Sequence, residues 1–461
     1  VYKRQVGDHL ITGGYEFETL DVFNLFIINA TGTVFFNSIA DLAAGNAYEI
    51  ISANSFTGDP VDAAAIYTRD ISSFFLQDKW DINESLQLIY GLRYDEYSTN
   101  DIPLENPNYI ARYGISNQVS WDGLDVVQPR IGLNYTLPDK YGDTRMSLGF
   151  GVFSGNDPTV WFSNAYQNFG GALGRATATG SALCDGSELQ VLSSGSFSGI
   201  PDCVLDTAQA QAQTISGTVN STDPDFDLPT VNRYSFGIEH NTDFESEFLS
   251  DWNVQLDIIA ADLNNQVDFL DLSLTQVGNA PDGRPTYAQV DPLLTGCGAT
   301  FNGPRQGYSN VTPACFGGNQ DVFFTNLPGD GGSTFTMSIQ ANKQFSWGDA
   351  NTLNLVLGYS YNESEIGNPG TSFTAAENFR AVVAEDINRV PVGASLRNTP
   401  QNFVISATWG NEFWSGYRTS LTAFFQRREG NPVSAVFGGS PYSSDIGDTG
   451  GRARNLLYVP T

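Results

Sequence analysis

The feature that most constrains the fold of this chain is a strict alternation of apolar and polar residues in segments of about ten residues. In segment 86–95, Leu88 and Tyr90 share one face of an extended strand, whereas Gln87 and Arg93 lie on the other face. A tilted strand of about ten residues is long enough to cross a lipid bilayer. The alternation predicts eleven strands, at 9–21, 71–81, 86–95, 130–137, 144–154, 230–240, 252–263, 334–343, 352–362, 401–409 and 417–428.

The alternation also assigns a face to each strand residue. The predicted lipid-facing residues include Leu88, Leu133 and Leu355, and the predicted lumen-facing residues include Gln87, Asn134 and Asn354. A shift of one residue in strand register would reverse every assignment.

The connections between the predicted strands alternate between short and long. The short ones fall at about 82–85, 138–143, 241–251, 344–351 and 410–416, and the long ones at about 22–70, 96–129, 155–229, 264–333 and 363–400. This pattern is typical of a transmembrane β-barrel with short periplasmic turns and long extracellular loops. A soluble β-sandwich has no reason to place every long loop at one end, although a lectin-like scaffold could do so in part.

The positions of the tryptophans favour the same interpretation. Five of the seven lie in or beside a short connection: Trp80, Trp252, Trp347, Trp409 and Trp414. Indole rings prefer the headgroup level of a membrane, where one edge is apolar and the N–H group is wet. Packing at strand ends is the alternative, but five tryptophans at one end favour an aromatic girdle.

Composition excludes several classes of protein. Of 461 residues, 41% are apolar and only 16% are charged, which is unlike a disordered chain. A net charge of −29 argues against nucleic-acid binding. No window of about 18 residues is continuously apolar, so we expect no transmembrane helix. The opening VYKRQ fits no strand pattern, and we expect residues 1–5 to be non-native sequence outside the fold.

An ordered set of segments resembles a known family. These are GGYEFETLDVFNLF (13–26), FFLQDKW (74–80), LIYGLRYD (88–95), VVQPRIGLNY (126–135), RMSLGFGVFSG (145–155) and LLYVP (456–460). Together they resemble the barrel of Oar-like TonB-dependent outer-membrane receptors, from about residue 9 to 461, with the weakest match at 176–228 and 272–333. The resemblance implies a barrel of about 22 strands, an N-terminal plug that fills it, and energy from the inner-membrane TonB complex.

The sequence departs from that family in what it lacks. We find no TonB box, no plug domain and no amphipathic terminal strand that ends in an aromatic residue. Eleven strands are half of the number that the resemblance implies, and a barrel must close to remove its edges. We therefore expect residues 6–461 to be a partial TonB-dependent receptor barrel domain, with the plug and the C-terminal part of the barrel absent.

Four cysteines fall in two of the long loops. Cys184 and Cys203 lie in one loop, and Cys297 and Cys315 lie in another, so three pairings are possible. Pairing within each loop is favoured because the loops would face an oxidising exterior. A cysteine-only zinc site would need a C-x2-C spacing that is absent, and we expect no metal site.

Three arginines are predicted on the lumen side, in the extracellular halves of their strands. These are Arg93, Arg130 and Arg233, in a chain with only 22 basic residues. A guanidinium group pairs well with carboxylate or phosphate. The residues therefore have two possible roles: pairing with acidic residues of the loops or the plug, or lining the route of an anionic ligand.

The sequence gives no indication of an enzyme. His9 and His240 fall at predicted strand ends, and no H-E-x-x-H, G-x-S-x-G or P-loop pattern occurs. We expect no catalytic residue and no cofactor. The leading hypothesis is a TonB-dependent transporter that imports an unidentified ligand across the Gram-negative outer membrane, with outer-membrane lipid and the TonB complex as partners. A passive porin, a surface adhesion barrel and a secreted β-rich glycosidase are the alternatives.

Overall fold

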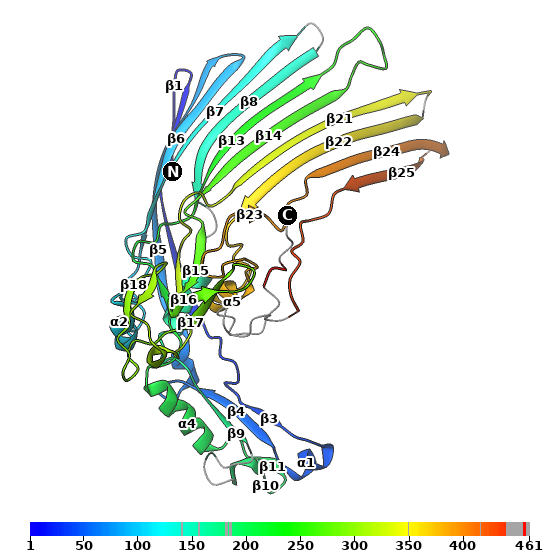
Figure 1. Ribbon diagram of the computed structural model, residues 1–461. Coiled ribbons are helices and arrows are strands. Elements are labelled where there is room, and N and C mark those ends of the chain that lie inside the picture. The colour runs from blue at the N-terminus through cyan, green and yellow to red at the C-terminus, as the bar shows by residue number, and fades with distance from the viewer. Residues whose placement is uncertain are drawn as a thin grey trace.

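The computed structural model describes residues 1–139, 142–154, 157–179, 183, 187–348, 350–414, 416–438 and 455–457. Its main element is a strongly curved antiparallel sheet of thirteen strands (Figure 1). In order across the sheet they are β1 (Tyr2–Val6), β2 (His9–Asn24), β5 (Ala65–Asn83), β6 (Leu86–Ser98), β7 (Asp125–Asp139), β8 (Gly142–Ser154), β13 (Thr230–Asn241), β14 (Asn253–Asn264), β21 (Ser333–Trp347), β22 (Asn351–Ile366), β24 (Gln401–Trp414) and β25 (Tyr417–Arg428), while β23 (Gly393–Ala394) pairs with β22.

All eleven predicted strands are present in this sheet, so the predicted antiparallel barrel architecture is confirmed. Each strand pairs with the next barrel strand in the sequence, as an up-and-down barrel requires. The pairing runs from β1 to β25, and no pairing joins these two strands within the described ranges. Among the same residues, no helix is long and apolar enough to cross a membrane.

The expectation that residues 1–5 lie outside the strand pattern is wrong. Tyr2–Val6 form strand β1, which pairs with the start of β2 from Val6 opposite His9 to Tyr2 opposite Gly13. Gly7 closes this hairpin with a φ of +58°, a conformation that glycine adopts without strain. Every residue of β1 is exposed, and an edge strand without a buried face carries no apolar alternation for the sequence to reveal.

The strand register separates the two predicted faces. Residues directly opposite each other in neighbouring strands share a face, and one row across the sheet reads Trp80, Leu88, Leu133, Leu148, Phe236, Ile258, Met337 and Tyr361. The next row, on the opposite face, reads Gln87, Asn134, Ser147, Gly237, Asp257, Ser338, Ser360 and Asn402.

The remaining two predicted residues follow the same rows. Leu355 is an even number of residues from Tyr361 in β22 and therefore shares its apolar face, whereas Asn354 shares the face of Ser360. Large apolar side chains such as Leu92 and Leu148 are about half exposed on the apolar face. Such a surface is suited to contact with lipid rather than water.

The five long connections lie at one end of the sheet and contain short elements of their own. These are β3 (Thr33–Phe35), α1 (Ile39–Ala44), β4 (Glu49–Asn54), η1 (Pro60–Ala63), α2 (Pro107–Tyr113), α3 (Thr159–Gln167), β9 (Gly174–Thr179), η2 (Ser187–Leu189), β10 (Leu192–Ser193), β11 (Ser196–Phe197), α4 (Asp202–Gln213), β12 (Asn220–Thr222), β15 (Val267–Asp271), β16 (Leu274–Asn279), β17 (Pro285–Gln289), β18 (Thr300–Gly303), β19 (Gly307–Ser309), η3 (Pro313–Cys315), β20 (Val322–Asn326) and α5 (Ala375–Ala381). Two small sheets join different connections: β3-β4-β9 and β12-β20-β15.

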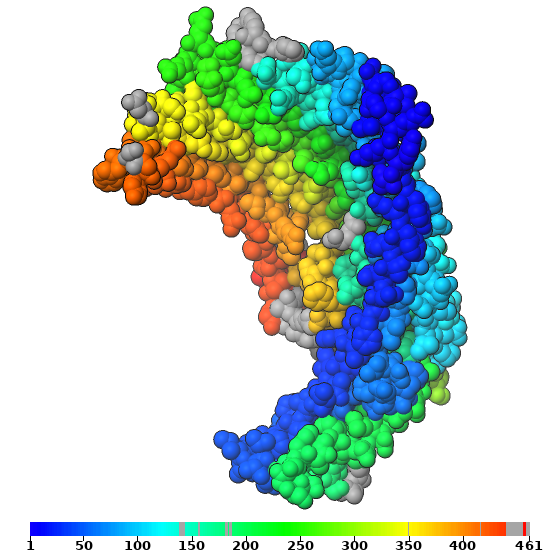
Figure 2. All heavy atoms as spheres, turned by 180° about the vertical axis from the view of Figure 1, so that it is seen from behind, coloured from blue at the N-terminus to red at the C-terminus, as the bar shows by residue number. Residues whose placement is uncertain are grey.

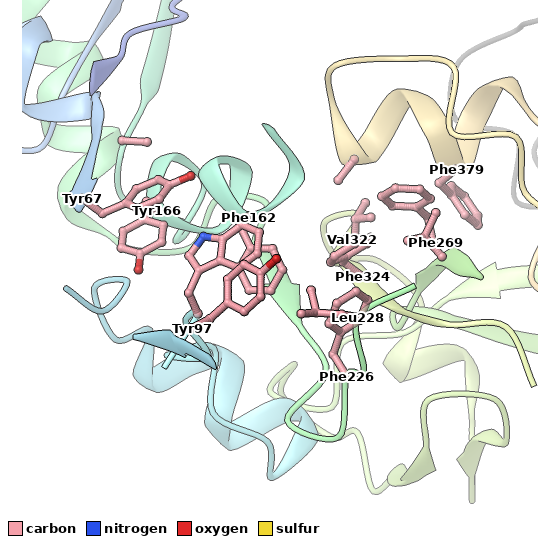
Figure 3. Close-up of a cluster of buried hydrophobic side chains, with 14 of the residues drawn as sticks. Tyr67, Tyr97, Phe162, Tyr166, Phe226, Leu228, Phe269, Val322, Phe324 and Phe379 are labelled. Carbon is pink, nitrogen blue, oxygen red and sulfur yellow. The ribbon is translucent and has the colours of Figure 1, made fainter. Parts of the chain in front are cut away.

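The largest buried core lies among these connections rather than in the barrel wall. Figure 3 shows aromatic side chains from separate segments meeting there, including Tyr97, Phe162 and Phe324. The Trp121 ring stacks on Phe162, with ring centroids 4.1 Å apart. A lobe built from β3, β4, β9 and α4 extends beyond this core, which gives the molecule a C shape in the space-filling view of Figure 2. The long loops therefore form a packed cap.

Candidate functional site

Arg130 and Arg233 lie in one row on the lumen face, on either side of Gly151. Gly151 is directly opposite Arg130 in β7 and opposite Arg233 in β13. The row continues to Gly91 beside Arg130 and to Ala261 beside Arg233. The structure thus brings these two predicted site residues together on the wall of the lumen.

The Phe153 ring lies against Arg130 and above Gly151. A Cβ atom added to Gly151 would lie 2.8 Å from the Phe153 ring, so the ring occupies the space that a side chain at position 151 would fill. The Arg130 guanidinium lies over the Phe153 ring, 4.9 Å from its centroid. A cation placed over an aromatic face is attracted by the negative face of the ring. Gly151 therefore allows Phe153 to fold back and support Arg130.

On the side of the short turns, the neighbours of the two arginines are small and uncharged. In the next row towards the short turns, Gly132, Gly149 and Ser235 lie side by side. Arg130 and Arg233 are both exposed, and across the residues described neither makes a hydrogen bond or an ion pair. The pair therefore presents two available cationic donors to the lumen.

Arg93 is on the same face but has a different environment. Its Nη1 donates to Glu16 Oε2 and its Nε to Asp95 Oδ1, both at 2.7 Å, and its Nη2 donates to Ser73 Oγ at 2.8 Å. The structure shows Arg93 paired with acidic residues, which is one of the two roles that the sequence left open. Those acids come from barrel strands, and the structure does not join Arg93 to the Arg130–Arg233 pair.

A polar cavity of about 710 Å³ lies beside Arg93. Its lining includes Glu16, Glu18, Asp95, Gln128 and Asp157. Most of these side chains are already engaged: Gln128 Nε2, for example, donates to Asp95 Oδ2 at 2.6 Å. The cavity is mainly acidic, which favours a polar or cationic guest over an anion.

Arg69, which the sequence analysis missed, pairs with two of the acidic residues that line this cavity, Glu18 and Asp157. It is 4% exposed and donates to Glu18 Oε1 at 2.8 Å and to Asp157 Oδ2 at 2.5 Å. Its guanidinium also lies 5.3 Å from the centroid of the Trp121 ring. Strand β5 begins at Ala65 and not at the predicted residue 71. If the predicted strand had been extended to Arg69, the alternation with Ile71 and Ser73 would have placed Arg69 on the lumen face.

Two buried aspartates, also missed, join four of the long connections. Asp271 Oδ1 accepts from the backbone N–H of Asp321, and Asp271 N–H donates to Asn388 Oδ1. Asp321 accepts from Val219 N–H at 2.9 Å and from Tyr113 Oη at 2.8 Å. We call Asp271 and Asp321 the loop hub.

Burial dominates the ionisation of the loop hub. Loss of hydration raises the pKa of Asp271 to about 7 and that of Asp321 to about 6. The Arg112 guanidinium, 3.2 Å from Asp321 Oδ2, opposes the rise in the pKa of Asp321. Nothing in the local sequence identifies these aspartates, because their partners come from distant loops.

Cys297 and Cys315 form a disulfide in the loop between β14 and β21. Cys203 is disulfide-bonded, but Cys184 lies outside the described residues, so the structure does not describe the predicted Cys184–Cys203 bridge. Within the same limits, no group of three or more His, Cys, Asp or Glu side chains is arranged to hold a metal ion.

His9 Nδ1 lies 2.7 Å from Asp78 Oδ2, and its ring stacks on Trp80 at the girdle.

Comparison with known proteins supports the barrel assignment. The family model described as "Outer membrane beta barrel domain" matches residues 2–455. No curated protein matches the sequence.

Several solved structures are similar to this chain. The outer membrane transporter YddB from Escherichia coli has 12% identity and a TM-score of 0.47, with 97% of this chain and 43% of that chain covered. The copper transporter OprC has 10% identity and a TM-score of 0.38, with 89% and 40% covered. The FrpB iron transporter from Neisseria meningitidis has 8% identity and a TM-score of 0.36, with 88% and 39% covered.

This chain thus spans less than half the length of each of these three proteins. The family match extends over nearly all of the sequence and agrees with the antiparallel strands of the structure. The chain belongs to the outer membrane β-barrel domain family, whose place is the outer membrane of Gram-negative bacteria.

Proposed function

We propose that this chain is part of the barrel of an Oar-like TonB-dependent receptor that imports a ligand across the outer membrane. In this proposal the chain, β1 included, supplies about half of a barrel of about 22 strands. The ordered sequence segments that resemble such receptors support it, as does a sheet whose edge strands β1 and β25 do not pair. The plug and the contact with the TonB complex belong to the complete protein.

The main support for the proposal is that neither Arg130 nor Arg233 has a carboxylate partner among the described residues. In a chain with 51 acidic and 22 basic residues, an arginine has many possible carboxylate partners. Arg93 is paired with two carboxylates, those of Glu16 and Asp95. Arg130 and Arg233 instead lie on the lumen face beside glycine and serine residues. Such a surface is suited to carboxylate or phosphate groups from outside this chain. The plug or a transported ligand would supply them.

The test uses the complete gene, with Arg130 and Arg233 changed to Gln singly and together. Arg145→Gln is the matched control, because Arg145 shares the lumen face of β8 but lies near its periplasmic end, beside Glu239. Uptake of ferric siderophores, haem and peptides is measured with and without a proton uncoupler, together with leakage of a large antibiotic.

Uptake that stops with the uncoupler supports active transport, whereas steady leakage that the uncoupler does not change identifies a passive porin. We expect the double variant to lower uptake about tenfold, as the loss of a strong ionic contact of about 1.4 kcal/mol would do. Unchanged leakage then points to ligand contact, and increased leakage points to plug docking. No change in either quantity contradicts the proposed role of the arginines.

A further inference from the structure

The connection between β13 and β14, residues 242–252, is the longest of the short turns and has a fixed internal structure. Thr242 Oγ1 donates to the carbonyl oxygen of Leu249 at 2.7 Å and accepts from the backbone N–H of Trp252 at 2.9 Å. The indole N–H of Trp252 donates to the carbonyl oxygen of Phe248, also at 2.9 Å. The turn is therefore a preformed unit rather than a loose link.

Lys343 fixes where this turn lies. Lys343 is directly opposite Leu355 in the register, which places it on the lipid-facing side of β21. Yet it is only 5% exposed, because its Nζ donates to the carbonyl oxygens of Glu247, Phe248 and Ser250. The turn therefore folds over the lipid-facing side of the sheet and not under the lumen.

This arrangement resolves an electrostatic problem. A lysine on the lipid face near the end of a strand is costly unless its charge is hydrogen-bonded or reaches water. Three carbonyl oxygens satisfy the ammonium group, and the Phe345 ring lies 4.8 Å from Nζ. The charge is thereby covered by the turn itself.

The outer surface of the turn is apolar and continues the membrane-facing surface. Phe248 is 65% exposed, Leu249 51% and Phe244 42%. Phe248 stacks on Phe345, and the Trp252 ring meets Phe345 edge-on.

Phe345 also lies in the girdle row of the barrel. It is directly opposite Leu353, which is in turn opposite Trp409. The exposed side chains of the turn are therefore at the level where indole rings mark the membrane boundary.

We propose that residues 242–252 form a lipid-contacting foot, with Phe248 and Leu249 inserted into the periplasmic leaflet and Lys343 as the positioning residue that holds the turn against the barrel wall. Aromatic and aliphatic side chains at this depth bury apolar area among lipid tails. The acidic residues of the turn, Asp243, Glu245, Glu247 and Asp251, are exposed, and the proposal places them on the aqueous side. The partner is the phospholipid surface, and the inference is independent of the transported ligand.

The test places a fluorescent NBD group on Cys at position 248 (Phe248→Cys) in the full-length protein, in vesicles of phosphatidylethanolamine and phosphatidylglycerol. Glu84→Cys, in the exposed turn between β5 and β6, is the matched control. We expect nitroxide-labelled lipid to quench the label at 248 at least twofold more than the label at 84, and aqueous iodide to show the reverse. Equal quenching by iodide at the two positions would overturn the proposal.

A second variant tests the positioning role. Lys343→Met keeps a long apolar stem but removes the three donors to the turn, so iodide quenching at 248 should rise towards the value at 84. Lys79→Met, on the lumen face of β5, is the control that should leave quenching unchanged. Unchanged protection at 248 in a folded Lys343→Met protein would refute the role of Lys343. If that variant does not fold, the label at 248 in the otherwise unaltered chain still decides the lipid contact.

Discussion

At the scale of single residues, the arrangement of side chains on the lumen face depends on glycine, which leaves space for its neighbours. Gly151 leaves room for the Phe153 ring, and the ring in turn supports Arg130. The alternation of the sequence gives the face of Arg93, Arg130 and Arg233, but it cannot give their partners. Glu16 is 77 residues from Arg93 in the sequence, and only the folded sheet brings the two together.

We predict that Gly151→Ala destabilises the barrel by about 1–3 kcal/mol, because the added methyl group must displace the Phe153 ring. Gly132→Ala is the matched control, since a Cβ at position 132 meets only the carbonyl oxygen of Leu148, at 3.7 Å. Thermal unfolding, followed by the shift in gel mobility of the unheated protein, measures both. Equal stability of the two variants would show that Phe153 does not depend on the space at Gly151.

At the scale of elements, the barrel strands could be predicted and the interior of the cap could not. Strands such as β6 and β22 carry a two-residue period that survives in the sequence because lipid and lumen impose opposite requirements on their faces. The cap follows no such rule. β12 pairs in parallel with β20, about a hundred residues later, and only tertiary packing selects that partner.

The loop hub predicts a pH dependence of the cap. The pKa of Asp271 is raised in the folded state from 3.8 to about 7. Below pH 3.8 the carboxyl group is protonated in both the closed and the opened cap. As the pH rises from about 4 to 7, the opened form loses its proton first, so the closed cap loses stability. We expect amide exchange in 267–273 to become at least about tenfold faster between pH 4 and pH 8, after correction for the intrinsic rate.

Asp271→Asn should flatten this pH profile, because an amide does not ionise. Asp225→Asn, at an exposed site of the same cap, should show the same pH profile as the unaltered protein. An unaltered protein with no pH dependence in this segment would show that Asp271 ionises normally and is not buried as described.

The disulfides give a second prediction for the cap. Peptide mapping without reduction should recover Cys297 linked to Cys315, and we propose that Cys184 is linked to Cys203. Replacing both Cys297 and Cys315 by Ser should lower the stability of their loop by about 3 kcal/mol, as expected for a link across 18 residues. Faster proteolysis within 297–315 reports this loss. A bridge between the two loops, or free thiols in protein from the cell surface, would contradict the pairing.

At the scale of the whole molecule, the sheet is a wall with two open edges. Strands β1 and β25 are exposed along their full lengths, and the apolar face carries large exposed side chains. Open edges and apolar surface both promote aggregation in water. This chain produced alone should therefore remain insoluble without detergent, as sedimentation and light scattering would report. A soluble monomer without detergent would count strongly against a membrane barrel.

The central claim is that neighbouring residues of one strand face lipid and lumen in turn, and nitroxide accessibility tests it most directly. Single spin labels are placed in the full-length protein in bilayers at Leu133 and Asn134 of β7 and at Leu148 and Ser147 of β8. Power saturation with oxygen, which concentrates in lipid, should give high accessibility at 133 and 148 and low accessibility at 134 and 147. The reverse pattern, or equal oxygen accessibility at adjacent positions, would contradict the assignment of the two faces.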